Sequence, residues 1–74
     1  MTQEEYTDLV NSVEQCIKDL RPLRKDQAAL DNASKLLVEF RWNGQHNQIF
    51  RQESVKFLEE MLDEMYEEIN TDGN

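Results

Sequence analysis

The sequence predicts an all-α fold, a small three-helix bundle. Three segments carry apolar residues at spacings of three and four, which is the period of an amphipathic helix. The chain breakers are few and fall between or after these segments: Pro22, Gly44 and Gly73. With 74 residues the chain forms at most a single domain, residues 1–74. The alternative is a helical hairpin that dimerises into a four-helix bundle.

The first helix is expected over about residues 3–20. Thr2, with Glu5 three residues later, forms a capping box that satisfies early backbone N–H groups. Pro22 ends the helix because the residue before a proline is pushed out of the α region. The apolar stripe holds Tyr6, Leu9, Val10, Val13, Cys16, Ile17 and Leu20.

The second helix is expected over about residues 25–42. Its shared apolar face holds Ala29, Leu30, Ala33, Leu36, Leu37 and Phe40. The Asn43–Gly44 pair predicts a stop, because Gly44 can adopt the left-handed conformation just past a helix end. The same pair also favours a β-hairpin turn, but the flanking residues do not alternate between apolar and polar as strands do.

The third helix is expected over about residues 54–69, with Ser54 as its cap. Its stripe holds Val55, Leu58, Met61, Leu62, Met65, Tyr66 and Ile69. A helix that continued from Asn47 would place Ile49 on the polar side. We therefore expect a break or bend between Gly44 and Ser54, and a frayed tail at 70–74.

Charge is distributed unevenly. The formal net charge is −8, and all eight basic residues lie between residues 18 and 56. An acidic chain repels phosphate groups, so neither direct nucleic-acid binding nor an anionic membrane surface is expected as a partner. The longest apolar run is the three residues 36–38, which is far too short to span a membrane.

No catalytic, cofactor or metal site is expected. One Cys and one His cannot form a metal framework of the Cys/His kind. Cys16 lies on an apolar stripe and His46 in a polar stretch, so neither has the partner that a nucleophile or a general base needs. A small domain without disulfides is typical of a reducing compartment, which predicts a cytoplasmic protein.

The third helix carries its acidic residues on one face. Four pairs with i,i+4 spacing bring like charges together, and each pair costs about 0.2–0.5 kcal/mol. Either the basic middle of the chain lies beside this face, or a basic partner does. Two interpretations stay open, a solvated face or an electrostatic docking surface. The residues are Glu59, Glu60, Asp63, Glu64, Glu67 and Glu68.

Three aromatic residues lie to the side of the predicted stripes. Trp42 is expected under a loop at 43–53 that folds back over it and Val38, and its alternative role is an exposed anchor for a partner. Phe50 and Phe57 are two helical turns apart and are expected to pack in the core. In the alternative they form a second patch that contacts another chain.

The sequence therefore predicts a small acidic protein-interaction module, an adaptor or inhibitor rather than an enzyme. Its partner would be another protein with a basic patch, and so small a core also favours a homodimer or higher oligomer. One alternative is an inhibitor that mimics nucleic acid. In composition alone the chain resembles small acidic phage proteins that block host enzymes. A further alternative is an anionic ligand held near Trp42 by Arg21, Arg24, Lys25 or Arg41.

Overall fold

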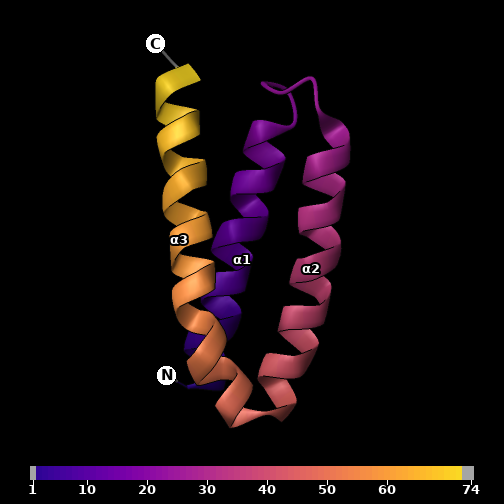
Figure 1. Cartoon of the computed structure of the whole chain (residues 1–74). Coiled ribbons are helices and arrows are strands. Elements are labelled where there is room, and N and C mark those ends of the chain that lie inside the picture. Colours follow the sequence, from indigo (N-terminus) through magenta and orange to yellow (C-terminus); the bar gives the residue numbers. More distant parts are fainter. Residues whose placement is uncertain (1, 73–74) are drawn as a thin grey trace.

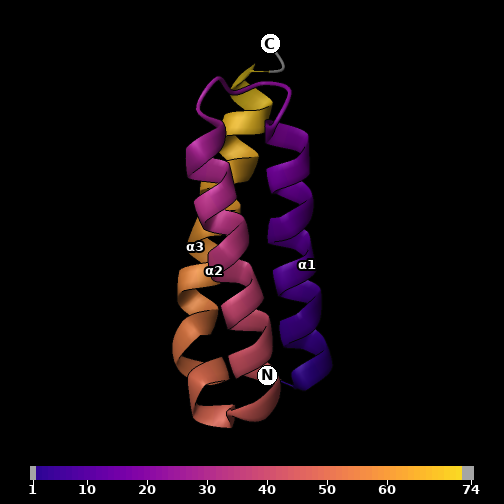
Figure 2. The ribbon, with the colours of Figure 1, turned by 90° about the vertical axis from the view of Figure 1, so that its right-hand side faces the viewer.

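The structure is a computed structural model that describes residues 2–72. Three helices follow one another: α1 (Gln3–Leu20), α2 (Gln27–His46) and α3 (Gln48–Asp72). They lie side by side, and α2 runs opposite to α1 and α3 (Figure 1). Figure 2 shows the same arrangement from the side of α2. Each helix packs against the other two, so the chain forms the expected three-helix bundle within itself, with no strand in residues 2–72.

Helix α1 has the bounds that its local signals predict. The Thr2 hydroxyl accepts a hydrogen bond from the Glu5 backbone N–H at 3.1 Å, and the Glu5 carboxylate accepts from the Thr2 N–H at 3.3 Å. At the other end the Leu20 carbonyl accepts from the N–H groups of Leu23 and Arg24, which closes a tight turn around Pro22. Both ends are set by residues within four positions of the helix, so the sequence is sufficient to predict them.

Helix α2 begins two residues later and ends four residues later than expected. Asp26 is its N-cap and accepts from the Ala29 N–H at 3.4 Å. The predicted stop at Gly44 is wrong, because the helix continues through Gly44 to His46. Gly44 is buried and does not adopt a positive φ, so its role is not that of a left-handed cap.

The connection between α2 and α3 is one residue, Asn47, in extended conformation. Its side-chain oxygen accepts from the Phe50 N–H at 3.1 Å, which caps α3 at its beginning. The predicted loop at 43–53 is therefore helical on both sides of a sharp turn. Ile49 lies on the outside of α3 and is 66% exposed, as a continuous helix requires.

The predicted cap at Ser54 is also wrong, since Ser54 lies inside α3 and is buried. At its other end α3 extends beyond the expected Ile69 to Asp72, and the Thr71 hydroxyl donates to the Glu67 carbonyl at 2.8 Å. The predicted frayed tail is thus helical as far as Asp72, while residues 73–74 lie outside the described range.

The core forms where the three apolar stripes meet. Its buried members are Tyr6, Val10, Val13, Cys16, Ile17, Leu20, Leu30, Leu37, Leu58 and Met65. All of the α1 stripe except Leu9 is buried, whereas α2 contributes only Leu30 and Leu37. Leu36, on the predicted apolar face of α2, is 41% exposed. Two neighbouring helices cover less than the whole apolar face of α2, and this leaves part of it at the surface.

Within residues 2–72, none of the helices has the length and apolar content that a membrane span requires.

Candidate interaction surface

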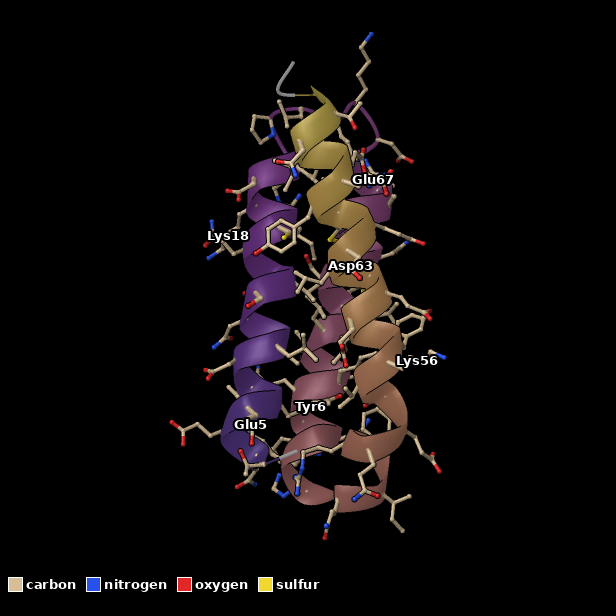
Figure 3. The ribbon with its side chains drawn as sticks, turned by 90° about the vertical axis from the view of Figure 1, so that its left-hand side faces the viewer. Glu5, Tyr6, Lys18, Lys56, Asp63 and Glu67 are labelled. Atoms are coloured by element: carbon tan, nitrogen blue, oxygen red, sulfur yellow. The ribbon has the colours of Figure 1, made fainter. Side chains whose placement is uncertain are left out.

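The outer face of α3 carries a group of exposed carboxylates. Five of its six predicted acidic residues are exposed and form no ion pair within the described part of the chain: Glu59, Glu60, Asp63, Glu64 and Glu67. Figure 3 looks onto α1 and α3 and shows Asp63 and Glu67 on the outer surface of α3. The face of α3 opposite to these residues holds the buried Leu58 and Met65. The expected division of this helix into an apolar and an acidic side is therefore present.

Glu68 differs from the other five. Its carboxylate accepts from Arg24 Nε at 2.7 Å, and both side chains are about one-third exposed. Arg24 lies in the connection between α1 and α2, so this ion pair ties that connection to the last turns of α3. Among residues 2–72 it is the only ion pair between the basic middle of the chain and the acidic residues of α3.

The other guanidinium groups are engaged elsewhere. Arg41 donates to Glu14 at 2.6 Å and to Asn11 at 2.8 Å, both on α1. Arg21 donates to Asp31 at 3.0 Å, and Arg51 donates to the Gly44 carbonyl near the end of α2. Arg21 and Arg41 therefore brace α1 against α2, Arg51 ties α3 to α2, and none of these three guanidinium groups pairs with the acidic face of α3.

The residues proposed to hold an anionic ligand do not converge. Arg21, Arg24 and Lys25 precede α2, whereas Trp42 lies in its last two turns. At 1.5 Å per residue, the beginning of α2 is about 22 Å from Trp42 along the helix axis. Three of these guanidinium groups also donate to carboxylates of the same chain, with which an anion would compete.

Three phenylalanines meet between α2 and α3. The Phe40 ring lies edge-on to Phe50 at 5.5 Å and to Phe57 at 5.6 Å, measured between ring centroids. Phe50 is partly buried against the core, as predicted, but Phe57 is 50% exposed. Three carboxylates lie on the same side of α3 as Phe57, because they are at −4, +3 and +7 from it in the sequence. They are Glu53, Glu60 and Glu64.

Trp42 lies on another side of α2. Its side chain is 65% exposed and Val38 is 68% exposed, so the predicted cover by residues 43–53 is wrong. The reason is that these residues continue α2 and begin α3 instead of folding back. The indole packs on His46 one turn later, at 4.3 Å between ring centroids. Trp42 is two residues from Phe40, about 200° around the helix, so Trp42 does not join the phenylalanine cluster.

The structure describes one surface depression and the surroundings of the single cysteine. An open depression of about 340 Å³ is lined by Gln3, Glu4, Thr7, Asp8 and Gln45. Nowhere in residues 2–72 do three His, Cys, Asp or Glu side chains converge to hold a metal ion. Burial raises the pKa of the Cys16 thiol, with Asp19 adding to the effect, so the thiol stays protonated and inert.

Comparison with protein-family models, with curated proteins and with solved structures finds no match for this chain. The α2 stripe predicts that both Leu36 and Phe40 face the core. Phe40 does pack against the core, whereas Leu36 is exposed. The signal that could have placed Leu36 at the surface is the width of the stripe, since Leu36 lies at one edge of it.

Proposed function

We propose that this protein is an interaction module that binds a partner protein carrying a basic surface. The observation that carries the proposal is the outer face of α3, where unpaired carboxylates surround the half-exposed Phe57. A face with a purely solubilising role has no need for a large aromatic ring among its charges. Charge and apolar area together are typical of a surface that another protein covers.

Energetics favour a basic partner. The like-charge pairs on α3 cost about 0.2–0.5 kcal/mol each, and cations of a partner would remove that cost on binding. Covering the exposed half of a phenylalanine, roughly 100 Å², contributes about 2–3 kcal/mol. Charge would speed and select the encounter, while Phe57 would supply the affinity.

The test is capture of partners from the native cell with matched variants. E60Q/E64Q/E67Q removes three charges from α3, and E4Q/D8N/D19N removes three exposed carboxylates from α1. A genuine partner is retained by the wild type and the second variant and is lost with the first. Retention of every captured protein by E60Q/E64Q/E67Q would overturn the proposal.

A second function has its own observation, the charge density of α3. Six carboxylates lie between Glu59 and Glu68, roughly 14 Å of helix, which is about one charge per 2.3 Å. Duplex DNA carries about one charge per 1.7 Å. We therefore propose, as the alternative, an inhibitor that occupies the basic groove of a nucleic-acid enzyme.

Competition separates the two functions. Duplex DNA should displace a nucleic-acid mimic from its captured partner, and the logarithm of its affinity should fall steeply with the logarithm of salt concentration. A partner held mainly through Phe57 should resist both treatments. Its affinity should instead fall when Phe57 is replaced by Ser.

A further inference from the structure

A shallow apolar strip runs along the junction of α2 and α3. The contacts of Phe40 with Phe50 and Phe57 show which side of α2 faces α3. Spacings of four, three and four residues place Ala29, Ala33 and Leu36 on the same side as Phe40. Two of these are alanines, which fill little of the space beside α3, and Ala29 is exposed. The strip therefore stays open to solvent beside Leu36 and Phe57.

Both rims of this strip are polar and carry more carboxylates than cations. On α3 the rim consists of the residues that share a side with Phe57. On α2 it consists of the residues at −4, +3 and +7 from Leu36. All six side chains are exposed and form no ion pair in residues 2–72. They are Glu53, Glu60 and Glu64 on α3, and Asn32, Glu39 and Asn43 on α2. The nearest lysine on each helix lies about 100° around that helix from Leu36 or Phe57, on the outer side of the rim. Lys35 is four residues before Glu39 and Lys56 is four residues before Glu60, so each borders a rim without forming an ion pair in residues 2–72.

We infer that this strip, which we name the α2–α3 groove, docks an amphipathic helix of a partner protein whose apolar stripe is flanked by Lys or Arg. The inference rests on the proposed function and names its surface and the form of its partner. An apolar strip between acidic rims is complementary to a helix that has an apolar stripe and cationic flanks. From Ala29 to Phe40 the strip is about 16 Å long, which matches about three helical turns.

A second copy of this chain is a poorer occupant. The rims carry four carboxylates, bordered by two lysines, and the outer face of α3 is acidic as well. Placing the groove of one copy on α3 of another would bring like charges together and desolvate them. Charge complementarity therefore favours a different, cationic protein.

The probe is a synthetic 14-residue peptide of leucine and lysine, with its leucines at helical spacings of three and four. The control peptide has the same composition and an order that distributes leucine around the helix. With labelled peptide and fluorescence anisotropy at low salt, the first peptide should bind about tenfold more tightly than the second, as loss of a buried apolar stripe implies. Equal affinity of the two peptides would overturn the inference that the groove binds an amphipathic helix.

Two variants on one helix locate the site. L36S removes an apolar side chain from the groove and V38S removes one from the Trp42 side of α2, and both positions are exposed enough to tolerate the change. L36S should weaken peptide binding about fivefold to tenfold, and V38S should leave it unchanged. Chemical shifts of the wild-type protein provide a measurement that needs no variant. Leu36, Phe40 and Phe57 should move with added peptide, and movement centred on Val38 and Trp42 instead would overturn the inference.

Two double variants distinguish docking in the groove from attraction by the acidic face alone. E60Q/E64Q neutralises two of the three carboxylates on the α3 rim, and E59Q/D63N neutralises two on the flank of α3 that faces α1. Only the first should weaken peptide binding about tenfold. Equal loss with both would show attraction by the acidic face without a groove, which leaves the proposed function standing and overturns the inference. Chemical shifts at Leu36 and Phe57 that depend on protein concentration alone would identify a second copy as the occupant, with the same consequence.

Discussion

The ring of Tyr6 lies directly against Gly44, where α1 crosses the end of α2. A methyl group added at Gly44 would approach three ring atoms of Tyr6 to less than 3.0 Å. The same ring extends to α3, where the Tyr6 hydroxyl lies 2.7 Å from Ser54 Oγ. One side chain thus connects all three helices at the end of the bundle near the α2–α3 turn.

Replacing Gly44 with Ala should destabilise the protein. In an exposed helix this change stabilises by about 1 kcal/mol, because Ala is the better helix former. Here the methyl group collides with a buried ring, and overpacking of this kind costs about 1–3 kcal/mol. Urea unfolding followed by circular dichroism should show G44A below the wild type in free energy of unfolding.

Two further variants show whether the cost arises from the ring. N43A changes an exposed neighbour and should stay within about 0.5 kcal/mol of the wild type. In the Y6L background, which has no ring at this position, G44A should cost less than it does alone. If G44A were as stable as the wild type, the close approach of Tyr6 would not limit the residue at 44.

The Tyr6 and Ser54 hydroxyls form an ordered pair. Ser54 Oγ donates to the Phe50 carbonyl at 2.6 Å, so its one hydrogen is engaged and Tyr6 is the donor to Ser54. S54A should therefore leave the buried Tyr6 hydroxyl without an acceptor, which should lower the free energy of unfolding by about 1–3 kcal/mol. Y6F/S54A should be more stable than S54A in thermal unfolding, because it removes this unpaired hydroxyl. A further loss in the double variant would contradict this assignment.

The same contacts explain which parts of the fold the sequence can predict. The bounds of α1 follow from Thr2, Glu5 and Pro22, which act within a few residues. The end of α2 was predicted wrongly because the role of Gly44 depends on Tyr6, thirty-eight positions earlier. The sequence does not distinguish a glycine that makes room for a neighbouring side chain from one that adopts a left-handed conformation. Ser54 is of a residue type that is common at helix caps, but its hydroxyl is the hydrogen-bond partner of Tyr6.

The candidate surface could be predicted only in part. The acidic side of α3 follows from its period alone. The α2–α3 groove does not, because its position depends on how much of the α2 stripe the two neighbouring helices cover. Leu36 and Leu37 are adjacent in sequence and both apolar, yet Leu37 is 2% exposed and Leu36 is 41% exposed.

Glu5 should link stability to pH. Hydrogen bonds from the Thr2 backbone N–H, and then from the Thr2 hydroxyl, lower the pKa of the Glu5 carboxyl. A carboxyl whose pKa is lowered in the folded state stabilises above its ordinary pKa, about 4.3 for Glu, and this contribution is lost as pH falls through the lower folded value. The stability difference between wild type and E5Q should therefore shrink over that acidic range.

An NMR titration of the Glu5 carboxyl tests the cause. T2A removes the hydroxyl and keeps the backbone donor, which is the larger cause, so the pKa of Glu5 should return only part of the way. A complete return in T2A would assign the effect to the hydroxyl alone.

Neutralising Glu64 and neutralising Glu68 should change the free energy of unfolding by different amounts, although the two residues lie one turn apart. Glu64 is unpaired among the described residues and takes part in two like-charge pairs, so E64Q should stabilise by about 0.4–1 kcal/mol at low salt. E68Q removes one such pair but also the bond to Arg24, so E64Q should exceed E68Q in free energy of unfolding by roughly 0.5 kcal/mol. The gain in E64Q should shrink at 1 M salt, where the screening length is about 3 Å. Equal stability of the two variants would mean that neither the Arg24 bond nor the additional like-charge pair of Glu64 contributes to stability. If E64Q gains stability and E60Q/E64Q loses the cationic peptide, the charge at this position costs stability and serves binding, which is the trade-off expected of a functional surface.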